Sequence, residues 1–327
     1  MKPPYTPIDS LQSPRFVGVR TFARLPALQT LEGVDFAIVG IPFDTGATFR
    51  VGARFGPEAI RSASALLRAY NPSLGIQVFP RFSVVDYGDA PVVPGYIKDS
   101  YERITAFLQP ILAAGVVPIS LGGDHSISLG ELRAVAAMHG PVALIQFDAH
   151  TDTWDSYFGH KHTHGTPMRR AVEEGLLDPG RSIQVGMRGS LYSPDDLAEA
   201  RALGFTVVTM DELRQRGLDS VLGQIHERVG HSPAFMSFDI DFVDPAFAPG
   251  TGTPEVGGPT SIEALALLRG LAGIHLVAAD VVEVLPAYDP AGVTALLGAN
   301  VAYELLSLLA LWKQTQQGSE TRPDLHG

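Results

Sequence analysis

Three short motifs rich in Asp and His are the clearest chemical signal in this 327-residue sequence. They read Gly-Gly-Asp-His, Asp-Ala-His-Thr-Asp and Asp-Ile-Asp, and their imidazoles and carboxylates are His125, Asp148, His150, Asp152, Asp239 and Asp241. Alternate residues of an extended segment point the same way, so Asp148, His150 and Asp152 can project into one cavity. Each motif alone has ordinary structural explanations. The three together indicate a metal centre.

The number of carboxylates in these motifs indicates two divalent cations. Four carboxylates in one pocket repel one another and raise each other's pKa, and two divalent cations balance their charge. Oxygen-rich ligation with some imidazole suits Mn²⁺, with Ni²⁺, Co²⁺ or Zn²⁺ as alternatives. Two such cations, roughly 3.5–4 Å apart, lower the pKa of a shared water and make hydroxide available near neutral pH. Such a metal-activated hydroxide can attack a carbon that resonance makes a poor electrophile.

Each motif follows a short, continuous apolar run. Eight such runs are predicted as strands, at residues 34–40, 82–85, 116–121, 142–147, 182–185, 205–208, 234–238 and 275–282. Amphipathic patterns predict helices at residues 56–70, 99–114, 128–139, 194–203, 210–229 and 261–271. Continuous apolar runs are typical of strands buried on both faces, and their alternation with helices predicts an α/β fold with a mostly parallel sheet. Ligands of such sheets lie beyond the carboxyl ends of the strands, where the motifs occur.

Composition excludes several classes of protein. The net charge of -11, without a basic block, argues against a nucleic-acid partner. No cysteine is present, so disulfides and thiolate metal sites are excluded, and a reducing cytoplasm fits. The N-terminus lacks the apolar stretch of a signal peptide, and no long uncharged apolar run predicts a membrane span. We therefore expect a cytoplasmic protein.

The chain reads as one domain, 1–327, without repeats or linkers. Its Pro-rich start, to about residue 31, is predicted to wrap the surface as an arm. The polar end, from about residue 313, is predicted to be a frayed tail. The apolar segment 305–312 between them is expected to be a core helix or a subunit contact.

The motifs and their flanking segments closely resemble the signatures of the ureohydrolase family, which contains the arginases and agmatinases. The segments that carry the resemblance are GIPFDTGATFRVGARFGPEAIR, GGDHS, DAHTD, HGTPMRRA, SFDIDFVDPAFAPGTGTPEVGG and ADVVEVLPAYD. The likeness extends over about residues 14–312. It implies a three-layer α/β/α domain with a central parallel sheet, a homo-trimer or homo-hexamer, and release of urea from a small guanidino compound.

The resemblance also implies a role for each donor. The first metal would be held by His125 and Asp152, the second by His150 and Asp241, and both by Asp148 and Asp239. Asp152 would in addition hold the bridging hydroxide by a hydrogen bond. Asp124, next to a ligand, is expected to bond backbone instead.

Two further residues resemble catalytic groups of the family. His164 would carry a proton to the leaving amine, since histidine titrates near the working pH, although His160 and His162 in the same loop are alternatives. Glu283 would bind the substrate guanidinium, because a carboxylate can accept two N–H donors in a fork. A salt-bridged carboxylate at a strand end is the other interpretation of Glu283.

The sequence leaves the substrate open. The loops resemble agmatinases and guanidino-acid hydrolases more than arginases, and agmatine, which would yield putrescine, is the leading expectation. Its cationic tail would require a second carboxylate at the mouth, with Asp155 or Asp196 as candidates. Guanidinobutyrate or guanidinopropionate would instead require an Arg, such as Arg188, or hydroxyl and backbone N–H donors. Leu285 replaces a Ser common in relatives, beside Glu283.

Other residues and other classes of protein were weighed against this interpretation. Trp154 and Tyr157 are expected either to border the pocket or to pack in the core. Arg50 and Arg54 are expected to pair with carboxylates at a subunit contact. A one-zinc deacetylase of related fold would need a different ligand set, and a noncatalytic partner subunit would have kept the fold without turnover.

Overall fold

The computed structural model describes residues 3–320, and its framework is an eight-stranded sheet. The strands are β1 (Phe36–Ile41), β4 (Val84–Asp89), β5 (Val117–Gly122), β6 (Ala143–Phe147), β7 (Ile183–Met187), β8 (Thr206–Thr209), β9 (Ala234–Asp239) and β10 (Leu276–Val282). They lie in the order β4-β1-β5-β10-β9-β6-β7-β8, and every pair is parallel. All eight correspond to predicted strands. The side chains of the central strands are buried on both faces, which explains their continuous apolar sequences.

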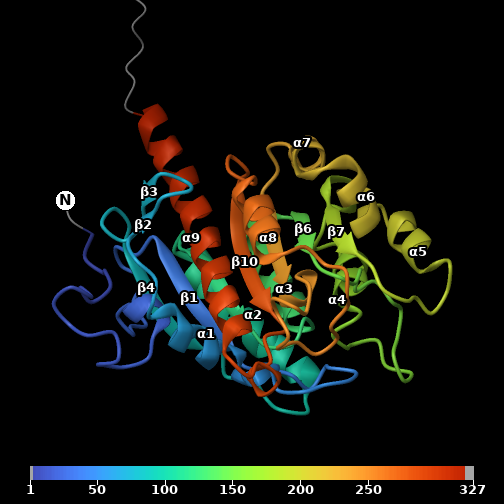
Figure 1. The fold of residues 1–327 in the computed structure, drawn as a ribbon, viewed down its shortest axis with the longest axis horizontal. Helices are drawn as coiled ribbons and strands as arrows, with labels where there is room; N and C mark the ends of the chain where they lie inside the picture. Colours follow the sequence, from blue (N-terminus) through green and yellow to red (C-terminus); the bar gives the residue numbers. More distant parts are fainter. Residues whose placement is uncertain (1–2, 321–327) are drawn as a thin grey trace, which may run out of the picture.

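Helices cover both faces of the sheet, and a separate hydrophobic cluster fills each interface (Figure 1). One layer contains α1 (Gly56–Ser64), α6 (Met210–Arg216), α7 (Leu218–Val229), α8 (Ser261–Arg269) and α9 (Val293–Glu320). The other contains α2 (Ile97–Ala113), α3 (Ile127–His139), α4 (Pro167–Glu173) and α5 (Asp196–Ala202). The predicted three-layer α/β/α architecture is confirmed.

Several predicted boundaries were wrong for local reasons. The predicted helix 210–229 is two helices, because Gly217 has a φ of 81° that a continuous helix does not allow. The predicted helix 56–70 ends at Ser64, and a short hairpin, β2 (Tyr70–Asn71) and β3 (Ile76–Gln77), follows it. The polar tail predicted from residue 313 starts as helix, since α9 continues to Glu320, and residues 321–327 lie outside the described part.

The helix α9 is the long apolar element of the described residues. Its segment Val293–Gln317 is long and apolar enough to cross a membrane, but 83% of its apolar window is buried within the protein. Residues 305–310 are fully or almost fully buried against the sheet. The predicted core helix is therefore found, and its hydrophobicity is explained by packing inside the domain.

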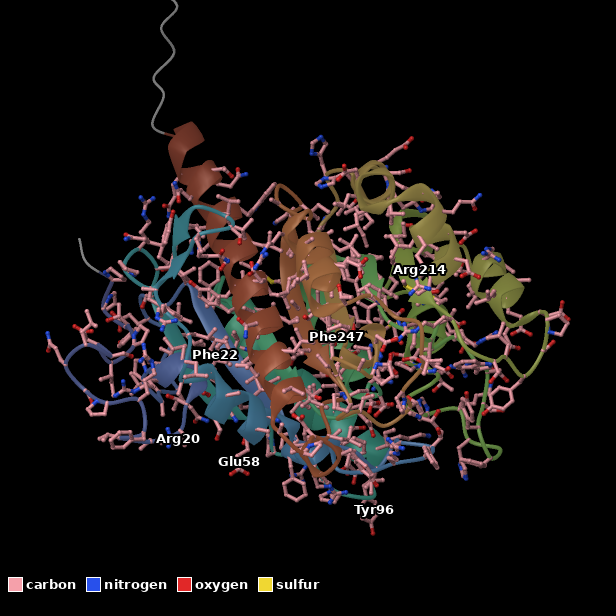
Figure 2. The ribbon with its side chains drawn as sticks, in the orientation of Figure 1. Arg20, Phe22, Glu58, Tyr96, Arg214 and Phe247 are labelled. Atoms are coloured by element: carbon pink, nitrogen blue, oxygen red, sulfur yellow. The ribbon has the colours of Figure 1, made fainter. Side chains whose placement is uncertain are left out.

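The Pro-rich arm has two parts that differ in burial. Leu11 is 96% exposed and Phe16 is 77% exposed, whereas Phe22 is fully buried beside α1. In Figure 2 the labelled side chains of Arg20 and Tyr96 lie at the edge of the molecule, in contrast to Phe22. The arm therefore wraps the surface up to about residue 20 and enters the core after it.

Candidate active site

The order of the strands decides where the predicted ligands meet. The strands β5, β10, β9 and β6 are consecutive neighbours, so their carboxyl ends form one continuous edge. His125 follows β5, Asp148 follows β6, Asp239 ends β9 and Glu283 follows β10. Gly123 allows the loop after β5 to approach the chain after β1, because a Cβ there would collide with two backbone carbonyl oxygens.

One group of donors surrounds Nδ1 of His125. This nitrogen lies 3.1 Å from Asp148 Oδ2, 2.8 Å from Asp152 Oδ2 and 3.2 Å from Asp239 Oδ2. All four side chains are buried. The first cluster therefore contains one imidazole and three carboxylates within reach of a single ion.

A second group surrounds Nδ1 of His150, which lies 3.1 Å from Asp241 Oδ2 and 3.6 Å from Asp148 Oδ1. Asp148 thus turns one oxygen to each cluster and links them. The side chain of His150 is 20% exposed, whereas those of Asp148 and Asp241 are buried. All six predicted metal ligands are brought together.

Hydrogen bonds behind His125 show that this donor set fits a cation. The Ser237 hydroxyl donates to Asp280 Oδ1 at 2.7 Å, so at 2.8 Å it accepts the Nε2 proton of His125. The neutral ring then has its lone pair on Nδ1, a buried atom that makes no hydrogen bond to a described residue. A lone pair that faces three carboxylates is unfavourable unless a cation lies between them or a proton occupies Nδ1. This arrangement matches the carboxylate–histidine pairs that orient metal ligands, with one serine interposed.

The pKa values of the clustered residues also indicate that the site requires positive charge. Burial and the charge of Asp148 raise the pKa of Asp152 to about 6. Burial and the charges of Asp241 and Asp148 raise the pKa of Asp239 well above its ordinary value. Burial opposes a charge on His125, but the surrounding carboxylates dominate and raise its pKa. Without a cation the site must therefore hold extra protons, and a cation can replace them.

His164 is held between Glu283 and Thr48. Its Nδ1 lies 2.9 Å from Glu283 Oε1, and its Nε2 lies 3.1 Å from the Thr48 backbone N–H and 2.7 Å from Thr48 Oγ1. Nε2 can accept from the N–H when neutral and donate to Oγ1 when protonated, so Thr48 can satisfy both protonation states. Burial lowers the pKa of His164, but Glu283 outweighs burial and raises it to about 9.

Glu283 lies behind His164 rather than at the open cavity. Its Oε1 also accepts the backbone N–H of His125 at 2.9 Å, and its buried Oε2 has no hydrogen-bond partner among the described residues. Glu283 and Asp152 share an unusual backbone, with φ of 63° and 53° respectively. Strained conformations of this kind cluster at functional sites. The neighbouring Leu285 is fully buried and does not line the cavity.

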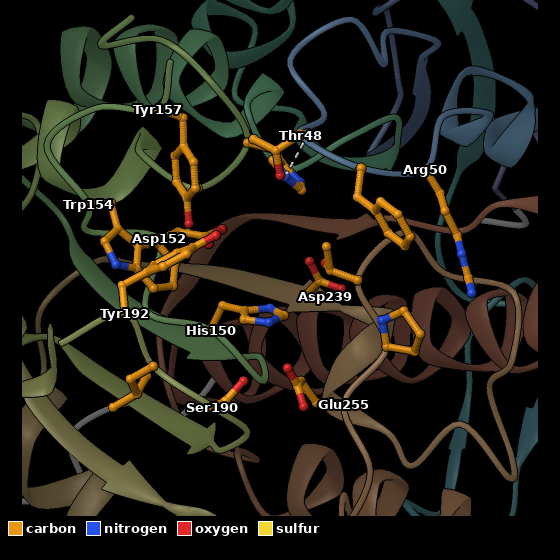
Figure 3. Close-up of a pocket in the computed structure, with 16 residues that line it drawn as sticks. Thr48, Arg50, His150, Asp152, Trp154, Tyr157, Ser190, Tyr192, Asp239 and Glu255 are labelled. Carbon is orange, nitrogen blue, oxygen red and sulfur yellow. Dashed lines mark hydrogen bonds between the residues drawn. The ribbon is translucent and has the colours of Figure 1, made fainter. Parts of the chain in front are cut away.

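A cavity of about 500 Å³ opens beside both clusters (Figure 3). It is lined by Thr48, Phe49, Arg50, His150, Asp152, Trp154, Tyr157, His164, Gly165, Ser190, Leu191, Tyr192, Asp239, Thr253, Pro254 and Glu255. Three predicted metal ligands and the predicted proton carrier thus face the same space. We call this space the substrate cavity.

The structure separates the candidates that the sequence left open. Of the three neighbouring histidines, His164 lines the substrate cavity, whereas His160 and His162 line a different one. Trp154 and Tyr157 border the substrate cavity. Three other residues were candidates for binding the substrate tail. None of them lines the substrate cavity: Asp155, Asp196 and Arg188.

Hydrogen bonds show the environments of four residues that the sequence singled out. Asp155 pairs with Arg170, and Asp196 accepts the backbone N–H groups of Tyr192 and Ser193. Arg188 donates to the carbonyl oxygens of Asp241 and Glu255. Asp124 accepts the N–H groups of Gly46 and Ser126, as expected of a residue that bonds backbone.

The two arginines of the first loop have different environments. Arg54 pairs with Asp44 within the chain. Arg50 instead lines the substrate cavity, with its guanidinium over the rings of Phe49 and Tyr288, at 5.5 and 4.8 Å from the ring centroids. Its Nη1 donates to the carbonyl oxygen of Thr251 at 3.5 Å, and the guanidinium has no carboxylate partner among the described residues. The expected pairing of Arg50 with a carboxylate at a subunit contact stays a prediction.

Sequence reasoning missed four residues that the geometry makes prominent. Glu255 lines the substrate cavity and accepts no hydrogen bond from a described residue on its carboxylate, although it lies inside the recognised loop PGTGTPEVGG. Thr48, Ser237 and Asp280 act through contacts between segments far apart in the sequence. No local pattern marks such contacts.

The comparison with known proteins agrees with this geometry. The model of the arginase family matches residues 34–307, most of the chain. The chain belongs to the arginase family. It is an amidinohydrolase of the agmatinase and guanidino-acid hydrolase branch and acts on guanidino compounds.

The relatives of this arginase-family chain have different named substrates. A guanidinopropionase of Pseudomonas aeruginosa is 49% identical over 305 residues, which cover 93% of this chain and 96% of the relative. A mitochondrial agmatinase of Gallus gallus is also 49% identical, over 90% of this chain and 87% of its own. The solved structure of proclavaminate amidino hydrolase from Streptomyces clavuligerus is similar with a TM-score of 0.88 and 42% identity, over 92% of this chain and all of that one.

Proposed function

We propose that this arginase-family chain is a two-metal hydrolase that cleaves a linear guanidino acid into urea and an amino acid. What supports the two-metal reading is the pair of linked clusters around His125 and His150. What supports a guanidino acid is Arg50, which lines the substrate cavity without a carboxylate partner among the described residues. The agmatine reaction that leads the sequence-based expectation becomes the second candidate.

The proposed metal ligands are the six predicted ones. His125 and Asp152 would serve one cation, His150 and Asp241 the other, and Asp148 and Asp239 both. Mn²⁺ is the proposed metal, because oxygen donors predominate in the set. When bound, the two cations supply Lewis acidity and a water of lowered pKa. The remaining chemistry belongs to side chains of this chain.

His164 is the proposed acid for the leaving amine. The amine leaves as a neutral group only if its nitrogen receives a proton, and a positioned histidine typically contributes about 10²- to 10⁴-fold to such a step. The pKa of about 9 keeps His164 protonated at neutral pH. The proton at Nε2 is held by Thr48 Oγ1 and can pass to a substrate nitrogen in the cavity that His164 lines.

Glu283 is proposed to bind the guanidinium and to support His164. Its Oε1 holds His164, and its unpartnered Oε2 is the acceptor available for a guanidinium N–H. A charge-assisted hydrogen bond of this kind is worth about 1.5–3 kcal/mol. The positive end of the substrate would therefore lie at the buried end of the site.

The distribution of charge in the outer cavity favours a carboxylate on the substrate tail. Glu255 is near the guanidinium of Arg188. Burial lowers the pKa of Arg188, whereas the nearby carboxylates, Glu255 among them, oppose this effect. The negative charge of Glu255 is therefore partly balanced by Arg188. Arg50 has no such counterion among the described residues. The hydroxyls of Ser190 and Tyr192, on the same cavity, can also donate to a carboxylate. An anionic tail would complete the charge balance.

Agmatine remains the alternative because of Glu255. A cationic amine requires a carboxylate at the mouth, as the sequence-based reasoning anticipated, and the carboxylate of Glu255 accepts no hydrogen bond from a described residue. The positive charge of Arg50 thus favours a guanidino acid, whereas the negative charge of Glu255 favours agmatine.

Urea release across a panel tests the proposal. The Mn²⁺-loaded protein would be assayed with 4-guanidinobutyrate, 3-guanidinopropionate, agmatine and arginine, together with the variants Arg50→Gln and Glu255→Gln. Loss of one charge-assisted contact should raise KM for a guanidino acid roughly 10- to 100-fold in Arg50→Gln, without a comparable effect on agmatine. If Glu255→Gln instead impairs agmatine, and agmatine is the best substrate, the alternative holds. Silence across the panel, with metal bound, would favour a noncatalytic partner subunit.

Two broader expectations accompany the proposal. We infer a homo-trimer or homo-hexamer from the family resemblance, with a cytoplasmic location and no nucleic-acid or membrane partner. Light scattering of the purified protein measures the first of these, and a monomer would refute it.

A further inference from the structure

A second cavity, of about 630 Å³, adjoins the substrate cavity. It is formed by the loops at residues 45–48, 95–98 and 157–163, and it shares Thr48 and Tyr157 with the substrate cavity. None of the six proposed metal ligands lines it. We call it the basic cavity after four of its lining residues, Lys98, His160, Lys161 and His162.

The charge of the basic cavity is unusual for this chain. The sequence has a net charge of -11 and contains only four lysines in 327 residues, and two of these four, Lys98 and Lys161, line this one cavity. No Asp or Glu is among its lining residues. A random distribution of lysines over the surface does not explain why two of the four lysines line one cavity that has no Asp or Glu in its lining.

The two lysines are only weakly compensated. Lys98 forms no ion pair with a described residue, and Lys161 lies 3.7 Å from Asp155, with both side chains more than half exposed. Exposed pairs of that kind contribute little. The cavity therefore keeps a positive potential that walls of low dielectric concentrate.

Polar groups without partners complete the wall. Thr163 is only 8% exposed, and its Oγ1 makes no hydrogen bond to a described residue. His162 Nδ1 is likewise buried and unpartnered. Burial lowers the pKa of His162, and the charges of Lys98, Arg133 and Arg170 lower it further, as expected in a positive region. Buried polar groups in proteins usually have partners, so a polar ligand or an ordered water beside this wall would satisfy these two.

The helix α2 begins at the same wall. Its first residues, Ile97 and Lys98, line the cavity, and its N-cap residue Tyr96 provides no side-chain cap. Uncapped N–H groups at the start of a 17-residue helix attract anions. Together with the lysines and the unpartnered Thr163, the helix start adds donors that an acceptor-rich ligand can satisfy.

We propose that the basic cavity is a binding site for a small oxyanion, a carboxylate or a phosphate-type group, separate from the substrate cavity. The two sources share the required chemistry, which is negative charge with several acceptor oxygens. The inference does not depend on the proposed substrate, since none of the six proposed metal ligands lines the basic cavity.

Titration calorimetry of the full-length, Mn²⁺-loaded protein tests this site. Sodium sulfate represents the phosphate-type group without precipitating Mn²⁺, and sodium succinate represents a carboxylate, each at an ionic strength fixed with chloride. The variants are Lys98→Gln with Lys161→Gln, the control Lys313→Gln on α9, whose lysine pairs with Asp35, and Arg50→Gln in the substrate cavity.

The site is supported if one equivalent of either anion binds per chain, the double lysine variant weakens binding at least tenfold, and the two other variants do not. Binding of sulfate alone identifies a phosphate-type ligand, and binding of succinate alone a carboxylate. The proposal is overturned if neither anion binds, if the double variant binds like the parent, or if Arg50→Gln abolishes binding. The thermal transition of each variant is measured to show that it is folded.

Discussion

Replacement of Ser237 by alanine should weaken metal binding without touching a ligand. The Ser237 hydroxyl accepts the Nε2 proton of His125 at 2.8 Å and donates to Asp280 at 2.7 Å, and all three side chains are buried. Ser237→Ala leaves a buried N–H and a buried carboxylate oxygen without partners, at a cost of about 1–3 kcal/mol. It also releases the ring from the tautomer that keeps the Nδ1 lone pair toward the carboxylates.

The expected loss is roughly 10- to 100-fold in affinity for the cation at His125, the range known for such supporting residues. At about 1.4 kcal/mol per tenfold change, this agrees with the cost of the unsatisfied groups. Competition with a fluorescent chelator measures the Mn²⁺ affinity, and metal analysis gives the content per chain.

Ser128→Ala is the matched control for this prediction. Ser128 Oγ donates to the other oxygen of Asp280 at 2.6 Å, and only the backbone N–H of Ser128, which the substitution keeps, donates to His125, at its carbonyl oxygen. It should therefore lower stability with a much smaller effect on metal affinity. Wild-type affinity in Ser237→Ala, or an equal loss in Ser128→Ala, would refute the reasoning.

Three further predictions concern the proton carrier and the cations. His164→Ala should keep both cations but lower kcat about 10²- to 10⁴-fold, which steady-state kinetics with metal analysis will decide. Glu283→Gln removes the charge that raises the pKa of His164 to about 9, whereas the burial that lowers this pKa remains. The alkaline limb of the pH profile of kcat should therefore move down by about one pH unit or more. An unmoved limb would exclude His164 as the acid. Chelation of the metal should lower Tm by several degrees, and by more at pH 8 than at pH 5. The pKa of Asp152 is raised to about 6, and carboxylates with raised pKa values make the metal-free protein less stable as the pH rises. Scanning fluorimetry measures this, and an equal or reversed dependence on pH would contradict it.

Local patterns were sufficient to predict the strands and to nominate the candidate metal ligands that the fold brings together. Each central strand is an unbroken apolar run because both of its faces are buried, and all eight strands were predicted within a few residues. The ligands follow strands at a spacing of two, the period at which extended residues share a direction. Where a single backbone torsion decides the outcome, as at Gly217 between α6 and α7, the pattern failed and two helices were predicted as one.

The sequence by itself thus determined the layers of the fold, the donor types and the family resemblance, because these depend on residue order over a few turns or strands. Only the tertiary structure decided that β5, β10, β9 and β6 are neighbours, that His164 rather than His160 or His162 faces the substrate cavity, and that Arg50 has no counterion within residues 3–320. These are contacts between segments up to 200 residues apart, such as Arg50 with Thr251. They depend on how separate elements pack, which no local periodicity encodes.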